Sequence, residues 1–328
     1  MKRLIAITVI LAGLWSGFWF YASGQKRAAI ENWFTAKQQD GWEASYSDLT
    51  VAGFPNRVDT TLDEVTLVNQ EGSVKWSAPF FQLLSLVYKP SHMIAIWPES
   101  QIVQTPFINA TLRHEDLRAS VVLNSDDSDI LNRLSLVGKG IEAKSDRGSW
   151  SAQDFKFAAE REAGAISDYK IAVSADQMSL KLPLVGGITL PDRFETLALD
   201  TRMTFAEPID ASTASVAPPS PSKVEIVSAD IHWASLQVAA SGTLEFDDMG
   251  VPSGALDFKL QNWDQMISDI ANSGAISHAQ AQSTRMMVGM LAASSGDPRE
   301  FDGTLTLVDG MMKIGQLSLG PAPRLSPR

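Results

Sequence analysis

The first 27 residues constrain this chain more than any other part of it. Lys2 and Arg3 precede a run of nineteen mostly apolar residues, from 4 to 22, and Lys26 and Arg27 follow it. As a helix rising about 1.5 Å per residue, this run covers about 28 Å, close to the ~30 Å hydrocarbon core of a bilayer. The sequence therefore predicts one membrane-spanning helix, and the positive charges at its start predict that this end stays in the cytoplasm.

The alternative interpretation of this segment is a cleaved signal peptide. The tripeptide Ala22-Ser23-Gly24 supplies the small residues that a signal peptidase recognises. However, the apolar run is longer than the usual ~7–15 residues, and bulky Trp19 and Tyr21 lie close to the potential cleavage site. We therefore expect residues 1–24 to be a retained single-pass anchor in the inner (cytoplasmic) membrane, with the bulk of the chain in the periplasm.

Composition narrows the classes of function. The chain has no cysteine, which excludes disulfides, thiolate nucleophiles and cysteine metal sites. Its net charge is −11, and the body beyond the basic N-terminal segment is more negative still. Such a body repels phosphate backbones, so we expect no nucleic acid among its partners. The membrane, through the N-terminal helix, is the first expected partner.

Hydrophobic periodicity predicts a mainly β (α+β) fold. Residues 25–41 are typical of a juxtamembrane helix, and from Trp42 onward apolar residues recur mostly every second position, as in strands with one solvated face. Two runs shift phase by one residue: the first after Leu62 and the second after Trp233. Each shift marks either a bulge within a bent strand or a break between two strands. Together these patterns predict a long, bent antiparallel sheet.

Local signals complete the expected architecture. Residues 42–328 are predicted to be one β-rich periplasmic domain containing a flexible, Pro- and Ser-rich loop at 206–223, which either connects strands of one sheet or separates two lobes. Asp309-Gly310 predicts a type I′ hairpin. A C-terminal helix pair is expected between Trp263 and Ser295, with Asn262 capping the first helix and a Ser277/Gln280 capping box opening the second.

Several motifs resemble one bacterial family. After the apolar helix and Gly41-Trp42, the segment Gly53-Phe54-Pro55-Asn56-Arg57 leads into a strand, and FDGTLTLVDG at 301–310 and LSLGPAP at 317–323 close the chain. These motifs resemble the uncharacterised family called domain of unknown function 2125. More distantly, a single membrane helix followed by a long periplasmic sheet is similar to AsmA-like proteins. That resemblance implies envelope biogenesis or lipid handling and supplies no catalytic residues.

The search for catalytic and metal sites gives no constellation, so we expect no enzyme and no cofactor. His114-Glu115-Asp116 lacks metal-ligand geometry because adjacent strand residues point to opposite faces, and a solvated polar stretch is favoured. Gly53, Phe54, Pro55 and Arg57 are expected to form a structural turn, with Arg57 pairing with a carboxylate on a neighbouring strand.

Apolar residues provide the candidate binding site. The run PFFQLLSLVY at 79–88 is continuous, so both faces of its strand must be covered by core, helix or ligand. The alternatives are ordinary core packing and a hydrophobic groove for lipid acyl chains, closed by a methionine-rich helix. The predicted lining consists of Phe80, Phe81, Leu83, Leu84 and Leu86, with Met286, Met287 and Met290 nearby. Two functions follow: lipid handling at the envelope, or a scaffolding component of an envelope complex with no groove.

Overall fold

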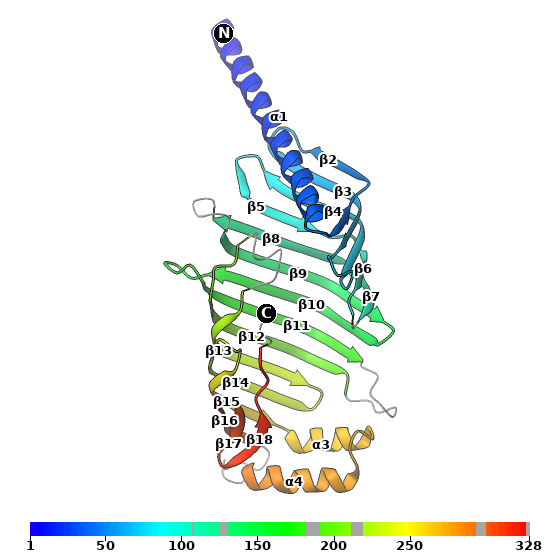
Figure 1. Ribbon diagram of the computed structural model, residues 1–328, viewed down its shortest axis with the longest axis vertical. Coiled ribbons are helices and arrows are strands. Elements are labelled where there is room, and N and C mark those ends of the chain that lie inside the picture. The colour runs from blue at the N-terminus through cyan, green and yellow to red at the C-terminus, as the bar shows by residue number, and fades with distance from the viewer. Residues whose placement is uncertain (107, 125–129, 182–190, 211–218, 293–299, 326–328) are drawn as a thin grey trace.

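The computed structural model describes residues 1–106, 108–124, 130–181, 191–210, 219–292 and 300–325. In these residues the chain forms three helices and one long antiparallel sheet, which confirms the expected mainly β fold. Helix α1 (Lys2–Gln39) lies at one end of the molecule, and α3 (Trp263–Asn272) and α4 (His278–Ala292) lie at the other (Figure 1). The strands are β1 (Glu43–Ser45), β2 (Asp48–Ala52), β3 (Arg57–Val68), β4 (Lys75–Leu86), β5 (Lys89–Ile96), β6 (Ser100–Gln104), β7 (Asn109–Arg113), β8 (Asp116–Asn124), β9 (Ile130–Ser145), β10 (Gly148–Arg161), β11 (Asp168–Lys181), β12 (Arg193–Phe205), β13 (Pro221–Trp233), β14 (Leu236–Phe246), β15 (Pro252–Gln261), β16 (Glu300–Val308), β17 (Met311–Ile314) and β18 (Leu317–Pro321).

The apolar N-terminal segment and the juxtamembrane helix form one continuous helix, α1, rather than two separate elements. Gly24 lies inside it without ending it, since a single glycine costs a helix only about 1 kcal/mol and no proline interrupts the run. The helix ends at Gln39, just before Gly41, whose φ of 82° suits a C-terminal stop. Its N-terminal half is exposed, and it is long and apolar enough to cross a membrane.

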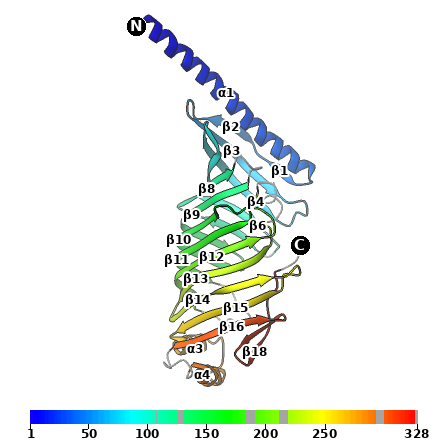
Figure 2. The same cartoon turned by 90° about the vertical axis from the view of Figure 1, so that its left-hand side faces the viewer.

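The strands follow one another along the long axis of the molecule, from α1 toward the α3–α4 pair (Figure 2). From β9 to β18 each strand pairs with the next one in the sequence. Nearer α1, long strands pair with two short ones placed end to end: β3 with β1 and β2, β4 with β5 and β6, and β9 with β7 and β8.

A line of irregularities crosses the long strands at matching positions. Glu64 in β3, Gly140 in β9 and Gln177 in β11 have positive φ angles of 51°, 56° and 47°. The paired registers skip Glu64 opposite Pro79, and Gln153 opposite both Gly140 and Gln177. The phase shift after Leu62 therefore lies at an unpaired position within one continuous strand, β3, and is not a break between two strands.

The sheet bends along this line toward its apolar side. Trp76 and Phe81 in β4 lie on either side of the bend, and so do Trp150 and Phe155 in β10. Five residues of extended strand separate Cα atoms by about 16 Å. Nevertheless, the ring centroids are only 5.8 Å apart in the first pair and 6.3 Å in the second. The two halves of each strand thus incline toward each other, and the face that carries these rings is concave.

Several local expectations have definite outcomes. The type I′ hairpin is confirmed, since Asp309 and Gly310 have φ angles of 52° and 71° between β16 and β17. The phase shift after Trp233 is a turn between β13 and β14. Strands β12 and β13, on either side of the 206–223 segment, pair directly within one sheet, and β13 begins at Pro221, inside that segment. Residues 211–218 lie outside the described part.

The C-terminal helix pair is confirmed, with one difference in its capping. The Ser277 backbone N–H donates to Gln280 Oε1 at 2.9 Å, and the Gln280 N–H donates to Ser277 Oγ at 3.2 Å, which is the predicted capping box. Asn262 occupies the N-cap of α3 in a left-handed conformation and makes no side-chain capping bond, so its predicted capping role is wrong. The predicted end of α4 near Ser295 lies outside the described residues.

Candidate functional site: a concave apolar face

One face of the sheet carries continuous rows of apolar side chains. Cross-strand partners share a face of a sheet, so the register identifies each row. One row crosses the sheet from β2 to β15 through directly paired residues, with Thr60 as its polar member. Its members are Val51, Thr60, Leu83, Ala95, Ala119, Leu136, Phe157, Val173, Leu199, Ala229, Ala240 and Phe258.

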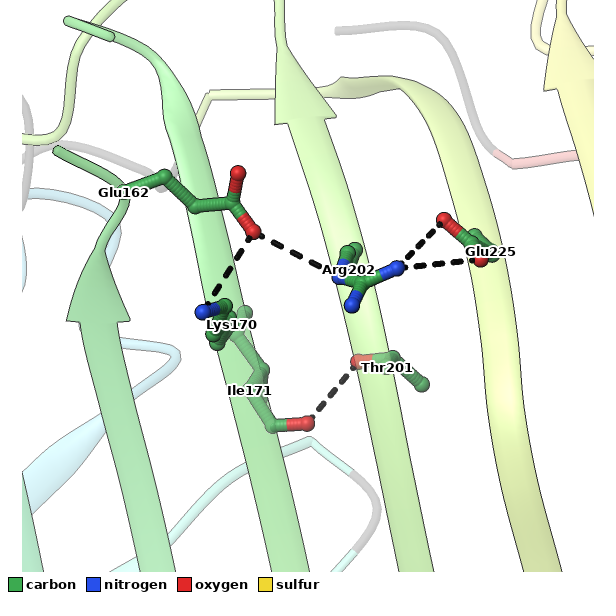
Figure 3. Close-up of polar contacts among 6 residues, drawn as sticks. All are labelled: Glu162, Lys170, Ile171, Thr201, Arg202 and Glu225. Carbon is green, nitrogen blue, oxygen red and sulfur yellow. Dashed lines mark hydrogen bonds and ion pairs between the residues drawn. The ribbon is translucent and has the colours of Figure 1, made fainter. Parts of the chain in front are cut away.

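A second row runs beside the first, two positions along each strand except in β13, where a register shift makes the separation three positions. It continues from β5 to β17, and Ala159, Thr201 and Gly242 interrupt its larger apolar side chains. Its members are Met93, Val121, Leu134, Ala159, Ile171, Thr201, Ile226, Gly242, Leu256, Leu305 and Ile314. The Thr201 hydroxyl donates to the Ile171 carbonyl at 3.0 Å, so this polar group is satisfied within the sheet (Figure 3).

On β11, β12 and β13 the opposite face is polar. Arg202 lies between Glu162, at 3.5 Å, and Glu225, at 3.3 Å, and Lys170 lies 4.0 Å from Glu162 (Figure 3). Arg202, Glu225 and Lys170 have exposed side chains and Glu162 is partly exposed, so each ion pair contributes little to stability. They do establish which face meets water, and the apolar rows lie on the other.

The helices pack on the concave apolar face mainly at its two ends. Near α1, Trp19 is buried against Val58 and Val87, and Phe34 is buried against Leu49. At the other end, α3 and α4 enclose a cluster of buried and half-buried apolar residues: Trp263, Ile267, Ala271, Ala281, Ala292, Phe301, Phe258 and Leu260. The first row therefore begins beneath α1 and ends beneath the α3–α4 pair.

Between these ends, the larger apolar side chains of the rows are only half-buried, whereas the small side chains of Ala95, Ala119 and Ala159 are buried. Four of the larger ones are half-buried although they occupy the centre of the sheet: Leu136, Phe157, Val173 and Leu199. From β5 to β14, seven spacings of about 4.8 Å between paired strands give a length of about 34 Å. One leaflet of a bilayer contains about 15 Å of hydrocarbon, so this length exceeds that of an acyl chain.

One margin of the concave apolar face is closed by a tightly packed cluster. Tyr169 in β11 is fully buried, and its hydroxyl donates to the Leu131 carbonyl at 2.9 Å. Phe205 and Ile209 pack against the same cluster, and the Leu131 N–H donates to the Ile209 carbonyl at 2.7 Å. The chain beyond β12 therefore folds back over the edge of the apolar rows.

Lys26 brings a positive charge to the start of the second row. Its Nζ lies 3.4 Å from Met93 Sδ, where α1 crosses the sheet. Burial lowers the pKa of Lys26 from its ordinary value, because the charged ammonium loses water there. An apolar row with an ammonium group at its start complements an amphiphile, because the row can contact the acyl chain and the ammonium group can pair with an acidic headgroup.

The structure divides the predicted lining residues of β4 between the two faces. Phe81 and Leu83 pair with Leu62 and Thr60 and lie on the concave apolar face. Phe80, Leu84 and Leu86 lie on the opposite face, where Leu84 and Leu86 line a pocket of about 270 Å³ with Arg57 and His92. A continuous apolar run has no period, so it does not indicate which of its residues face the core.

The predicted methionines lie far from β4. Met286, Met287 and Met290 are exposed on α4, at the opposite end of the sheet (Figure 1). The expectation that they lie near the β4 run is therefore wrong, since nearly the whole sheet separates the two groups. Sequence reasoning instead missed the central residues of the two rows, whose alternation identified strands but not their partners.

The predicted turn at Gly53, Phe54 and Pro55 is confirmed, and it contacts α1. Gly53 has a φ of 106°, and its carbonyl accepts from the Arg57 N–H at 2.9 Å. The Trp15 indole donates to the Pro55 carbonyl at 2.9 Å. Arg57 pairs with Asp59 at 2.7 Å within β3, and not with a neighbouring strand as predicted.

The described residues contain no group of three or more His, Asp or Glu side chains placed to hold a metal ion. His114 is buried, which corrects the prediction of a solvated polar stretch, while Glu115 is exposed and Asp116 pairs with Arg118 at 3.0 Å. Burial lowers the pKa of His114, and the Pro98 carbonyl and the carboxylates of Asp116 and Glu99 oppose this shift.

Comparison with known proteins identifies the family of the chain but no individual protein that is similar to it. No curated protein and no solved structure matches the chain. The more distant similarity to AsmA-like proteins therefore stays a prediction. The family model described as an uncharacterised protein conserved in bacteria (DUF2125) matches residues 19–323, from Trp19 in α1 to the end of the sheet. Because this match covers most of the chain, the protein belongs to the DUF2125 family.

Proposed function

We propose that this protein is an inner-membrane-anchored periplasmic protein that holds or passes lipid acyl chains along the concave apolar face. It acts without catalysis and without a cofactor. Lys2 and Arg3 precede the apolar part of α1, which favours a cytoplasmic N-terminus and a periplasmic sheet. The carrying observation is the pair of apolar rows whose larger side chains, such as Leu136, Phe157 and Leu199, stay half-buried between α1 and the α3–α4 pair.

The free-energy cost of exposing apolar surface to water supports a ligand on this face. An extended apolar surface in water is unfavourable by about 25 cal/mol per Å², so a single-layer sheet with one apolar face gains stability when that face is covered. An acyl chain is flexible and apolar along its whole length, and it can lie across many strands without needing polar partners. Lys26, at the start of the second row, suits an acidic headgroup on the same molecule.

The test uses two neighbouring residues of β9 that lie on opposite faces. Leu136 belongs to the first row, while Val137 pairs with Arg118 and Lys156 on the polar face, and both are half-buried. Lipid is extracted from purified full-length Leu136→Asp and Val137→Asp and quantified by mass spectrometry. We expect several-fold less lipid in Leu136→Asp and the wild-type amount in Val137→Asp. Lipid bound around α1 is present in both variants, so the difference between them reports on the concave apolar face alone.

Circular dichroism shows whether each variant retains its sheet. A half-buried aspartate at 136 reaches water, so we expect the fold to persist, whereas a dry core would unfold around it. If Leu136→Asp unfolds, Leu199→Asn and its control Ala198→Asn give the same comparison in β12, where they also occupy opposite faces. Equal lipid content in folded variants of both faces would contradict the proposal.

A scaffolding role is the second candidate, and the exposed methionines favour it. Met286, Met287 and Met290 are 57%, 49% and 72% exposed, at the end of the molecule farthest from α1. A protein partner bound there would protect them from oxidation by peroxide. Lower oxidation of these three residues in native membranes than in the purified protein, together with lipid-free extracts, would support scaffolding over lipid handling.

A further inference from the structure

The turn between β2 and β3 reaches far along the apolar part of α1. The Trp15 indole donates to the Pro55 carbonyl at 2.9 Å, and the Trp19 indole donates to the Arg57 carbonyl at 2.6 Å. Trp15 precedes the end of the apolar run, Ala22, by about 10 Å of helix. If α1 spans a bilayer with that run, the turn lies at or below the level of the headgroups.

The carbonyl groups of this turn are suited to an environment with little water. The Gly53 carbonyl accepts from the Arg57 N–H at 2.9 Å, and the Asn56 carbonyl accepts from the Val87 N–H at 2.9 Å. With the two indole bonds, the carbonyls of Gly53, Pro55, Asn56 and Arg57 are all satisfied by protein. A turn in water needs no such partners, whereas backbone groups in a bilayer must find them.

Exposed aromatic rings continue the apolar surface of the helix onto the sheet. Phe54 is 53% exposed, and its ring centroid lies 5.5 Å from that of Trp19 and 6.3 Å from that of Phe20. Tyr88, in the neighbouring turn between β4 and β5, is 58% exposed, and the adjacent Val87 packs against Trp19. Aromatic side chains of this kind favour the interfacial layer of a membrane.

We propose that the β2–β3 and β4–β5 turns insert Phe54 and Tyr88 into the interfacial layer of the bilayer that α1 crosses. This inference rests on the proposed membrane-spanning role of α1, and not on lipid binding by the sheet. The two turns hold the first strands against the membrane surface, so the concave apolar face begins at the bilayer itself. The occupant of this surface is lipid because the rings are continuous with the exposed apolar surface of α1.

The absence of cysteine makes the test direct, since any introduced thiol is the only one. Phe54→Cys, Tyr88→Cys, Leu11→Cys and Met249→Cys are each labelled with an environment-sensitive fluorophore in the full-length chain. The proteins are reconstituted into phosphatidylcholine vesicles that contain phosphatidylcholine with a nitroxide near the headgroup end of its acyl chain. Met249 is 62% exposed between β14 and β15, and Leu11 is 60% exposed in the middle of the apolar run.

We expect several-fold stronger nitroxide quenching at positions 54 and 88 than at 249, with a blue-shifted emission at the first two. The Tyr88→Cys variant controls for local misfolding. Phe54→Cys removes a ring that contacts α1, whereas Tyr88→Cys replaces an exposed ring. Quenching at 11 but not at 54 or 88 would overturn this inference and leave the anchor intact. No quenching at 11, measured with nitroxides at several depths, would overturn the membrane-spanning role of α1 as well.

Discussion

Replacing Trp19 by alanine should loosen the contact between α1 and the sheet. Trp19 is 6% exposed, packs against Val58 and Val87, and donates its indole N–H to the Arg57 carbonyl. Removing a buried tryptophan side chain costs about 3–5 kcal/mol. At about 2 °C per kcal/mol for a chain of this size, the thermal midpoint should fall by about 6–10 °C.

The assay is thermal unfolding of the sheet, followed by circular dichroism of the full-length protein in detergent. Phe18→Ala is the matched control, since Phe18 is the preceding aromatic residue of α1 and is 47% exposed. We expect the control to unfold at the wild-type temperature. A Trp19→Ala midpoint equal to wild type would refute the docking of α1 on the sheet. A mature protein that begins at Gln25 would refute the retained anchor, because Trp19 would then be absent from it.

Two further predictions concern buried groups of the sheet. Tyr169→Phe removes the hydroxyl that satisfies the Leu131 carbonyl, so the free energy of unfolding in urea should fall by about 1–3 kcal/mol, whereas Tyr88→Phe, at an exposed site, should leave it unchanged. Burial lowers the pKa of His114, so the unfolded chain binds its proton more readily. Stability from this group is present above the unfolded pKa of about 6.5 and is lost as the pH falls through that value toward the lower folded pKa. Unfolding of His114→Gln between pH 8 and pH 5 should therefore show a smaller loss of stability than wild type, and an unchanged pH dependence would contradict the assignment.

Local signals in the sequence predicted individual elements well because each depends on a few neighbouring residues. Asp309-Gly310 fixed a hairpin through its positive φ angles, and Ser277 with Gln280 fixed the start of α4. The alternation of apolar residues from Trp42 onward was enough to predict strands with one solvated face. The mainly β architecture follows from many such signals.

The candidate site was harder to predict because it depends on pairing between distant strands. Alternation in β12 says that Leu199 and Ala198 face opposite ways, but only the register places Leu199 beside Val173 and Ala229. Likewise, β4 pairs with both β5 and β6, and nothing local in the sequence encodes that choice. The separation of the β4 run from Met287 follows from this order of strands.

The line of irregularities explains how one apolar face persists across a bent sheet. Because the side-chain period of a strand is two, a one-residue shift moves every later side chain to the other face. Trp150 and Phe155 are an odd number of residues apart, yet they lie on the same face because the register skips Gln153 between them. The same holds for Trp76 and Phe81 on either side of Pro79. Because these irregularities lie at matching positions in successive strands, paired strands change phase together, and both halves of the bent sheet stay apolar on the same face. The concave apolar face is therefore a property of the whole array of strands, and it extends from α1 toward the far end of the molecule.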